Sequence, residues 1–237
     1  MYPWLDFDLL HLRLRDEKTE PVPWGGYAAG RYTAHLVSGS NAAAGFKDRH
    51  LGTYTRTIVA GDETHPLIMD IVFDLEPDLP ELPKVGITAQ IPVKYSNITW
   101  FGKGPQESYP DRCTGTFLGL YEDTPASLEV GYIVPQENGN RMGVRYIGLS
   151  GKDNAALPVT ILSEEPVHMS VSRYTQENLW QSLHTCDLVD LSAGDDGCYF
   201  LNIDCAQRGV GTATCGPDTL EQYRVRPGIF RMRLYVY

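Results

Sequence analysis

A two-residue alternation of apolar and polar side chains is the feature that most limits what this chain can fold into. In residues 67–75 every second residue, beginning with Leu67, is apolar, and in residues 230–236 apolar side chains alternate with Arg231, Arg233 and Tyr235. Successive side chains of a β-strand point to opposite faces, so this period is typical of strands with one buried and one solvated face. Residues 10–15 repeat the rhythm, and strands are therefore predicted near both ends.

Further short strand candidates are separated by segments rich in Gly, Pro, Asp and Asn; they are residues 54–59, 144–149, 159–162, 168–172 and 199–203. Helix is predicted only over Thr175–His184, where Thr175 provides a capping hydroxyl. Residues 76–83 contain three prolines, which remove three backbone donors, so this segment is predicted to be a rigid connection. The pattern predicts an all-β, antiparallel two-sheet sandwich that forms a single domain over residues 1–237.

Charge and cysteine content exclude several classes of function. The net charge of -10 disfavours binding to nucleic acid or to an anionic membrane surface. The N-terminus lacks the basic and apolar regions of a signal peptide, and no apolar run is long enough to cross a bilayer, so a cytoplasmic protein is expected. Five cysteines, without a CxxC pair, argue against a disulfide framework and a zinc knuckle, and no metal or other cofactor is expected in this chain.

Several motifs carry a resemblance to a known family. The segment WFGKGPQESYPDR at residues 100–112 has the pattern G-x-G-P-x-E-x-Y-x-D-R, and it resembles the signature of the C-terminal small-chain domain of family-two β-galactosidases. Other matching segments follow in the expected order: LPELPKVGI at residues 79–87, VPQENGNR at 134–141, SRYT at 172–175 and LNIDCAQRGVGTATCGP at 201–217. The resemblance therefore extends from about residue 75 to the end of the chain.

The resemblance implies a fold, a partner and a division of labour. The implied fold is the supersandwich also found in galactose mutarotases. In these enzymes both catalytic carboxylates lie on a separate TIM barrel, which needs about 250 residues of alternating strand and helix that this sequence does not show. We therefore expect a non-catalytic chain that packs on the barrel portion, completes the aglycone side of a β-galactoside site, and is inactive alone. An oligomer is expected in the assembled enzyme, and any metal sites would lie on the barrel.

The first seventy residues match less well. WLDFDLLHLRLRD at residues 4–16 resembles one segment of the same domain, but the strands that normally come before it are absent from this sequence. We therefore expect the N-terminal edge strands of the sandwich to be missing or supplied by another chain. An exposed sheet edge is a pairing hazard, which predicts a loss of stability in the isolated chain.

Cys215 is the candidate substrate-binding residue. In the family the resemblance points to, the loop after G-x-G carries an aromatic residue or a cysteine that reaches the aglycone side of the sugar, and residues 209–217 match the cysteine version. The alternative is that Cys215 fills a turn as a small apolar group. No catalytic residue and no metal ligand is expected in this chain.

Two polar clusters invite a catalytic interpretation. Glu107, Tyr109, Asp111 and Arg112 lie close together in the signature segment, and residues 136–139 with Arg141 and Arg145 form a second group. Because an acid–arginine pair can pin a loop, and because Asn-Gly favours a turn, a structural role is favoured for both. Glu107 and Glu137 form the motif-borne glutamate pair that a self-contained retaining glycosidase would need about 5 Å apart.

Two further hypotheses remain open. A mutarotase-like epimerase would use a general acid and base, for which His168 and His184 are the candidates, although His184 near a helix end is also a capping or packing residue. A free-standing carbohydrate-binding module would stack a sugar on an indole ring. Of Trp4, Trp24, Trp100 and Trp180, only Trp24, between Pro23 and Gly25, is predicted to be an exposed binder.

Overall fold

The computed structural model describes residues 13–22, 29–38, 48–152, 156–194, 196–211 and 216–237. The chain divides into two compact units. Unit 1 comprises Met1–Val85, Ser163–Glu165 and Cys205–Tyr237, and unit 2 comprises Gly86–Leu162 and Pro166–Asp204. That residues 1–237 form one single domain stays a prediction.

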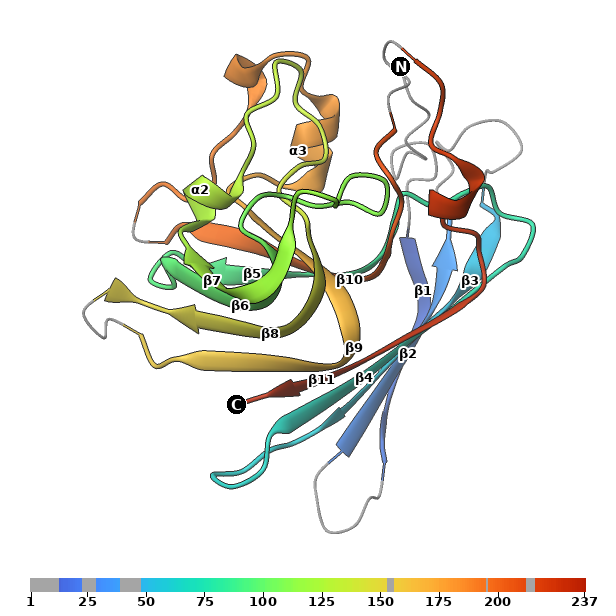
Figure 1. Ribbon diagram of the computed structural model, residues 1–237. Helices are drawn as coiled ribbons and strands as arrows, with labels where there is room; N and C mark the ends of the chain where they lie inside the picture. The colour runs from blue at the N-terminus through green and yellow to red at the C-terminus, as the bar shows by residue number, and fades with distance from the viewer. Residues whose placement is uncertain (1–12, 23–28, 39–47, 153–155, 195, 212–215) are drawn as a thin grey trace. The chain divides into compact units, whose positions relative to one another are not determined.

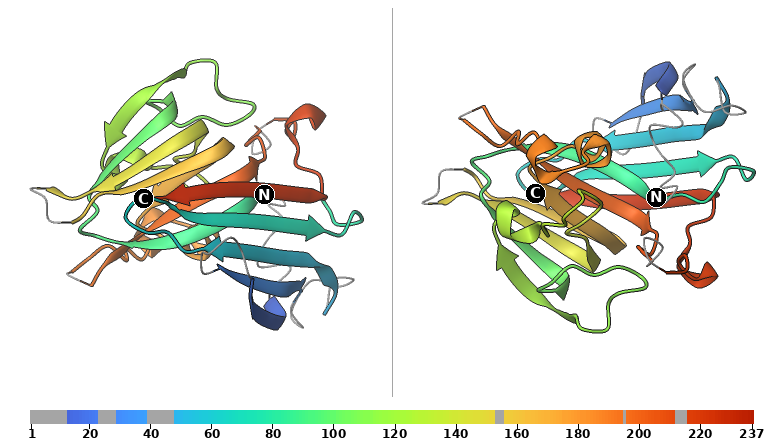
Figure 2. Two further views of the ribbon diagram at one scale, coloured as in Figure 1. Left: turned by 90° about the horizontal axis from the view of Figure 1, so that it is seen from below. Right: turned by 90° about the horizontal axis from the view of Figure 1, so that it is seen from above.

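Unit 1 is built on five antiparallel strands in the order β1-β2-β3-β4-β11 (Figure 1). Their bounds are β1 Arg13–Pro21, β2 Ala29–Val37, β3 His50–Val59, β4 Leu67–Leu75 and β11 Ile229–Val236, with a 3-10 turn at Glu221–Tyr223. Strands β4 and β11 lie side by side (Figure 2), with Met232 opposite Ile71. Both side chains are buried, whereas Arg233 is exposed and forms an ion pair with Asp70 directly across the ladder.

Unit 2 contains the antiparallel path β9-β8-β6-β7, with β10 paired to both β9 and β5. The bounds are β5 Lys84–Pro92, β6 Asn97–Gly104, β7 Phe117–Asp123, β8 Arg141–Ser150, β9 Val159–Ser172 and β10 Cys198–Gln207. Three short helical segments join them: α2 Pro125–Leu128, α3 Gln176–Gln181 and a 3-10 turn at Thr185–Asp187. Trp100 on β6, Ile147 on β8 and Met169 on β9 are fully buried at the centre of this unit.

The predicted all-β class is confirmed, because the described residues are mostly antiparallel strands with few helical turns. The strands predicted at residues 67–75 and 230–236 correspond to β4 and β11. Residues 76–83 form no strand, as their prolines predicted, and contribute only an isolated bridge from Leu82 to Val225. The predicted helix corresponds to α3, where the Thr175 hydroxyl accepts the backbone N–H of Asn178 at 3.0 Å.

The strand candidates of the sequence did not include β2, β5, β6 or β7, and α2 was not predicted either. The sequence of β7, FLGLYED, places apolar residues on both faces of the strand, so a two-residue period cannot reveal it. Strand β5 does alternate, since Val85, Ile87, Ala89 and Ile91 are apolar at every second position, so its two-residue period was visible in the sequence and was overlooked. The strand predicted at residues 10–15 coincides in part with β1, and residues 1–12 lie outside the described part of the chain.

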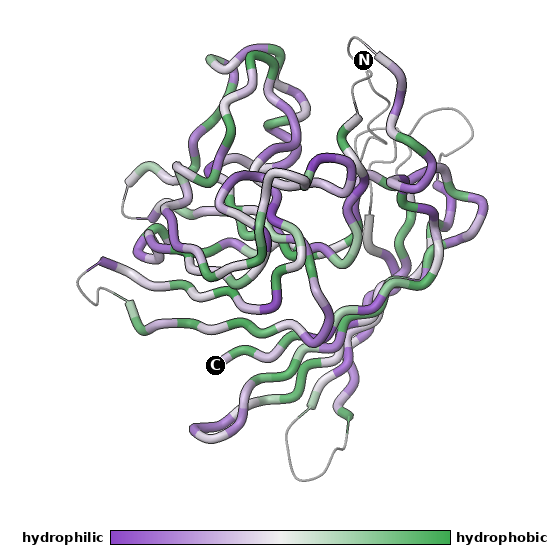
Figure 3. The backbone as a smooth tube through the Cα atoms, viewed as in Figure 1, coloured by the Kyte–Doolittle hydropathy of each residue, from purple (hydrophilic) through white to green (hydrophobic). Residues whose placement is uncertain are grey.

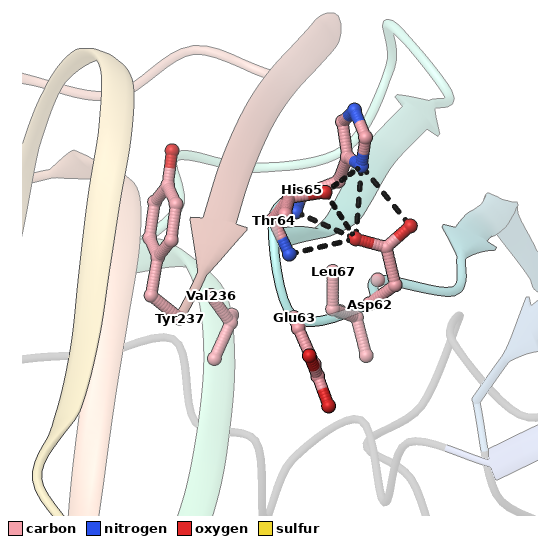
Figure 4. Close-up of a pocket in the computed structure, with 8 residues that line it drawn as sticks. Asp62, Glu63, Thr64, His65, Leu67, Val236 and Tyr237 are labelled. Carbon is pink, nitrogen blue, oxygen red and sulfur yellow. Dashed lines mark hydrogen bonds and ion pairs between the residues drawn. The ribbon is translucent and has the colours of Figure 1, made fainter.

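The turn between β3 and β4 is strongly hydrophilic (Figure 3). Its Asp62 carboxylate accepts the backbone N–H groups of Thr64 and His65 at 2.8 and 2.9 Å. These bonds, of which that from Thr64 is the largest influence, lower the pKa of Asp62. Residues 62–65 also line a pocket with Val236 and Tyr237 (Figure 4). Several donors converge on the one Asp62 carboxylate, which is typical of a turn that is capped by a side chain.

In the part of the chain that the structure describes, no helix is long and apolar enough to cross a membrane.

Candidate functional site

The signature segment of unit 2 is organised around the carboxylate of Glu107. One oxygen, Oε1, accepts hydrogen bonds from the Arg112 guanidinium and from the Tyr132 hydroxyl, each at 2.5 Å. The other, Oε2, accepts the backbone N–H of Gly139 at 2.8 Å. Since Glu107 is only 10% exposed, these contacts replace the water that an ionised carboxylate would otherwise bind. Three separate stretches of unit 2 are thereby joined at one side chain.

Further hydrogen bonds of the backbone and of two side chains join the segments around Ser108 and Asn140. The N–H of Ser108 donates to the carbonyl of Asn140 at 2.7 Å, and the Asn140 side-chain amide donates to the carbonyl of Ser108 at 2.6 Å. The Ser108 hydroxyl in turn accepts the N–H of Met142 at 3.0 Å. Ser108 and Asn140 are both fully buried, so each polar group meets the requirement that buried donors and acceptors be paired.

Arg141 is buried at the base of this arrangement, with 3% of its surface exposed. Its guanidinium donates to the carbonyls of Leu128 and Gly139, both at 2.7 Å, and to that of Pro105 at 3.1 Å. It also lies over the Trp100 ring at 5.4 Å. Burial lowers the pKa of Arg141, and the charge of Glu107 opposes this effect. The arginine therefore ties loop carbonyls to the core of unit 2.

Tyr109 is the aromatic member of the signature, and it is fully buried. Its hydroxyl lies 3.5 Å from the carboxylate of Glu137, and the Arg112 guanidinium lies over its ring at 5.2 Å. Burial, with smaller contributions from the negative charges of Glu137 and Glu107, raises the pKa of Tyr109 well above its usual value. The Tyr109 phenol therefore stays protonated, and Tyr109 does not provide a phenolate for catalysis.

These contacts favour a structural role for the two polar motifs. The signature segment and residues 134–141, far apart in the sequence, pack against each other. At the Asn138-Gly139 pair, where a turn was predicted, Gly139 has a φ of +74°, and a Cβ there would lie 2.8 Å from the carbonyl oxygen of Leu128. Glu107 is occupied by three donors and Glu137 faces Tyr109, so the carboxylates serve the packing of loops. Asp111 is half-buried beside them, and Arg145 is exposed on β8.

A second acid–arginine clamp lies in the same unit. Arg173, from the SRYT motif, donates through Nη2 and Nε to one oxygen of Glu129 at 2.7 and 3.0 Å, and through Nη1 to Asp190 at 3.0 Å. The other Glu129 oxygen accepts the backbone N–H of Arg173 at 2.6 Å and the Ser172 hydroxyl at 3.3 Å. The hydrogen bond that Arg173 donates to Glu129 is the largest influence that raises the pKa of Arg173. Arg173 thus joins the segment after α2 to the segment around residue 190.

The histidines proposed for epimerase chemistry have different partners. The Nδ1 atom of His168, on β9, lies 3.1 Å from the side-chain amide of Asn140. His184 is exposed, and its Nδ1 lies 3.4 Å from Asp187, which also accepts the His184 backbone N–H at 2.9 Å. His184 therefore has the capping role that was its alternative. Neither contact favours an acid–base pair.

The aromatic and cysteine candidates fare unequally. Trp100 is fully buried, in agreement with a core role, but Trp180 is exposed on α3, so the expectation that only Trp24 is exposed was wrong for Trp180. Trp4 and Trp24 lie outside the described residues, and so does Cys215, the predicted substrate contact. In the described part of the chain, no group of three or more His, Cys, Asp or Glu side chains is arranged to hold a metal ion.

Two members of these clamps were missed by sequence reasoning. Tyr132 donates to Glu107, yet it lies two residues before the VPQENGNR segment and belongs to no motif. Glu129, which binds Arg173, lies still further before the VPQENGNR segment and also belongs to no motif. The SRYT motif itself was a usable signal, because an arginine in a loop calls for a carboxylate partner. The identity of the carboxylate partner could not be predicted, because Glu129 and Arg173 are more than forty positions apart in the sequence.

Comparison with known proteins identifies the protein family of this all-β chain. A family model described as "Beta galactosidase small chain" matches residues 49–236. The chain belongs to this family, and the resemblance inferred from the signature motifs is confirmed.

Three relatives are all named β-galactosidase. The protein of Vibrio cholerae is 37% identical over 172 residues, which are 73% of this chain and 15% of the relative. That of Kluyveromyces lactis is 31% identical over 62% of this chain and 14% of its own length. That of an Arthrobacter species is 28% identical over 94% of this chain and 21% of its own length. The chain therefore spans about a fifth or less of the relatives that it matches.

Proposed function

We propose that this chain is a non-catalytic small-chain portion of a β-galactosidase, which packs on a catalytic TIM-barrel portion and completes the aglycone side of the galactoside site. The observation that carries the proposal is the family match over residues 49–236, combined with the small share of each β-galactosidase that this chain covers.

The chemistry of unit 2 supports the division of labour. A retaining glycosidase needs one carboxylate free to attack and a second able to donate a proton. Glu107 is instead held by a guanidinium, a phenol and a backbone N–H, which fix its position and favour the ionised, packing role over attack on a sugar or donation of a proton. The carboxylates that perform hydrolysis are therefore assigned to the barrel portion.

Cys215 is proposed as the residue that contacts the aglycone. The proposal comes from the match of residues 209–217 to the cysteine version of the family's loop. A thiol is small and polarisable, and it packs favourably against an aromatic leaving group. It would affect binding of the aglycone more than the chemical step.

Hydrolysis of a chromogenic β-galactoside tests the proposal. The purified chain is assayed alone and after co-expression with the barrel-bearing remainder of the Vibrio cholerae relative. Turnover only in the mixture is expected. No turnover in the mixture, with saturable binding of galactose by the chain alone, would indicate a free-standing sugar-binding module instead. Accelerated anomer exchange that depends on His168 or His184 would indicate an epimerase.

The aglycone contact is tested in the complemented enzyme. Cys215→Ala is expected to raise KM for a nitrophenyl galactoside by several-fold while kcat changes less, because binding of the leaving group is weakened. Cys113→Ala, a cysteine of the signature loop, is the matched control and should leave both constants unchanged. Equal kinetics for Cys215→Ala and wild type would remove Cys215 from the site.

A further inference from the structure

Unit 2 exposes apolar side chains on two segments that meet at Arg173. The first segment follows α2 and the second follows α3. Their exposed members, which we call the docking surface, are Ile133, Val134, Leu183, Val189 and Leu191. Ile133 is 92% exposed and contributes almost nothing to the core of unit 2, whereas Leu183 at 65%, Val189 at 56% and Leu191 at 40% are only partly packed. Figure 1 shows both segments at the same end of the unit.

The two segments are held together by the Arg173 clamp. Glu129 stands at the start of the first segment, and Asp190 lies between Val189 and Leu191 in the second. Arg173 binds both acids, and its carbonyl accepts the backbone N–H of Leu191 at 3.1 Å. A surface whose backbone is already fixed loses little conformational entropy when a partner binds. The clamp thus presents exposed apolar groups in a prearranged form.

Such an arrangement is costly unless it is covered. Apolar surface in water costs about 25 cal/mol for each Å², and contiguous exposed apolar patches mark interaction sites in soluble proteins. A single exposed leucine needs no explanation, but five apolar side chains on two segments pinned by the partly buried Arg173–Glu129 pair do.

The chemistry of the flanks narrows the choice of partner. Glu177, Asp187 and Asp190 are exposed on the same stretch of chain as the apolar side chains of the second segment, and the whole chain carries a net charge of -10. In a symmetric dimer through this surface the acidic groups would face their own copies, which is repulsive. A partner surface with an apolar centre and a basic rim is complementary.

We infer that the docking surface binds the catalytic portion of the β-galactosidase, with Arg173 as the residue that positions it. This inference rests on the proposed function and gives it a location. Its occupant corresponds to the part of the relatives that the chain does not match, about four fifths or more of their length. The partner face is apolar at its centre and carries lysine or arginine at its rim.

The edge strand β7 supplies a matched control. Phe117 is 72% exposed and Leu118 63%, which are fractions close to those of the docking surface, and both belong to unit 2. Substitution at either place removes a comparable exposed apolar group, so general effects of surface polarity are the same in both sets of variants.

Titration of the chain into the barrel-bearing remainder of the Vibrio cholerae relative, followed by calorimetry, tests the inference. Ile133→Asp and Val189→Asp are expected to weaken binding at least about tenfold, whereas Phe117→Asp and Leu118→Asp change it less than about twofold. Arg173→Gln should also weaken binding, and a rise from 50 to 300 mM salt should weaken wild-type binding, because the rim contacts are charged.

The outcomes separate the two proposals. Wild-type binding with equal affinity for Ile133→Asp and Val189→Asp, and loss of binding for the β7 variants, would overturn the docking surface while the proposed function stands. Absence of wild-type binding, with active hydrolysis by the chain alone, would overturn both. Circular dichroism of each variant confirms that a loss of affinity is not a loss of fold.

Discussion

Residues 129–141 contain two neighbouring regions that reverse the usual placement of side chains. At the C-terminal end, Arg141 and Asn140 are polar and buried, with every contact directed into unit 2. A few residues earlier, Ile133 and Val134 are apolar and exposed. In this segment the polar residues that resemble an active site are structural, whereas the residues that face solvent have the features of a binding surface.

The largest expected effect is at the buried end of this segment. Arg141→Ala removes the donor of three loop carbonyls and a group packed on Trp100. We expect the free energy of unfolding to fall by more than about 3 kcal/mol, or the protein not to fold. Urea unfolding followed by tryptophan fluorescence measures it, with the exposed Arg145→Ala as control. Similar losses for both variants would contradict the assigned role.

The next effect is at the Glu107 carboxylate. Glu107→Gln keeps the shape of the side chain but removes the charge that binds Arg112, and it weakens the contacts to Tyr132 and Gly139. A loss of about 2 kcal/mol of unfolding free energy is expected. Glu122→Gln, on the exposed face of β7, should change stability by less than about 0.5 kcal/mol.

A smaller effect is expected at the turn between the two regions. Gly139→Ala forces a Cβ to within 2.8 Å of the Leu128 carbonyl oxygen in a left-handed conformation. The expected cost is about 1–2 kcal/mol. Gly115→Ala is a suitable control, since no atom lies within 4 Å of the added Cβ. If Gly139→Ala were as stable as its control, the close packing of this turn would be disproved.

A substitution in the exposed region should leave the stability of the chain almost unchanged. Ile133→Ser removes an apolar side chain that is almost fully solvated, so the free energy of unfolding should change by no more than about 0.5 kcal/mol. Thermal unfolding measures it. A loss near that of Glu107→Gln would show that Ile133 is packed in the isolated chain, and the contrast between the two regions would disappear.

The smallest effect concerns an exposed polar cluster, the turn of Asp62 in unit 1. Hydrogen bonds from Thr64 and His65 lower the pKa of Asp62 below its usual value of 3.8 in the folded chain. A depressed pKa means that the contribution to stability is present above the unfolded-state value and is lost as the pH falls through the folded-state value. Carboxyl NMR across pH 5 to 2 should show late protonation of Asp62, and a titration at the ordinary value would contradict these bonds.

Sequence reasoning predicted the class of fold because alternation is a local property. Strands β4 and β11 are regular, and their alternation was visible without knowledge of their pairing. Strand β7 escaped because it is an edge strand with Phe117, Leu118 and Leu120 all exposed, so burial imposes no period on it.

The polar clusters were predictable in role but not in partner. An arginine and an acid in one motif indicated a clamp, and Asn138-Gly139 indicated a turn, since both depend on nearby residues. The contact of Tyr132 with Glu107, and that of Glu129 with Arg173, join segments 25 and 44 positions apart. These contacts are determined by the fold and cannot be inferred from neighbouring residues in the sequence. The exposure of Ile133 was equally invisible, because the sequence reads as an ordinary apolar pair beside a proline.

The most direct test of the central claim is the rate of hydrolysis of a chromogenic β-galactoside by the purified chain alone. We expect the background rate, unchanged in Glu107→Gln and Glu137→Gln, because both carboxylates serve packing. Turnover above background that either substitution abolishes, with the fold retained, would contradict it and would make Glu107 and Glu137 a catalytic pair.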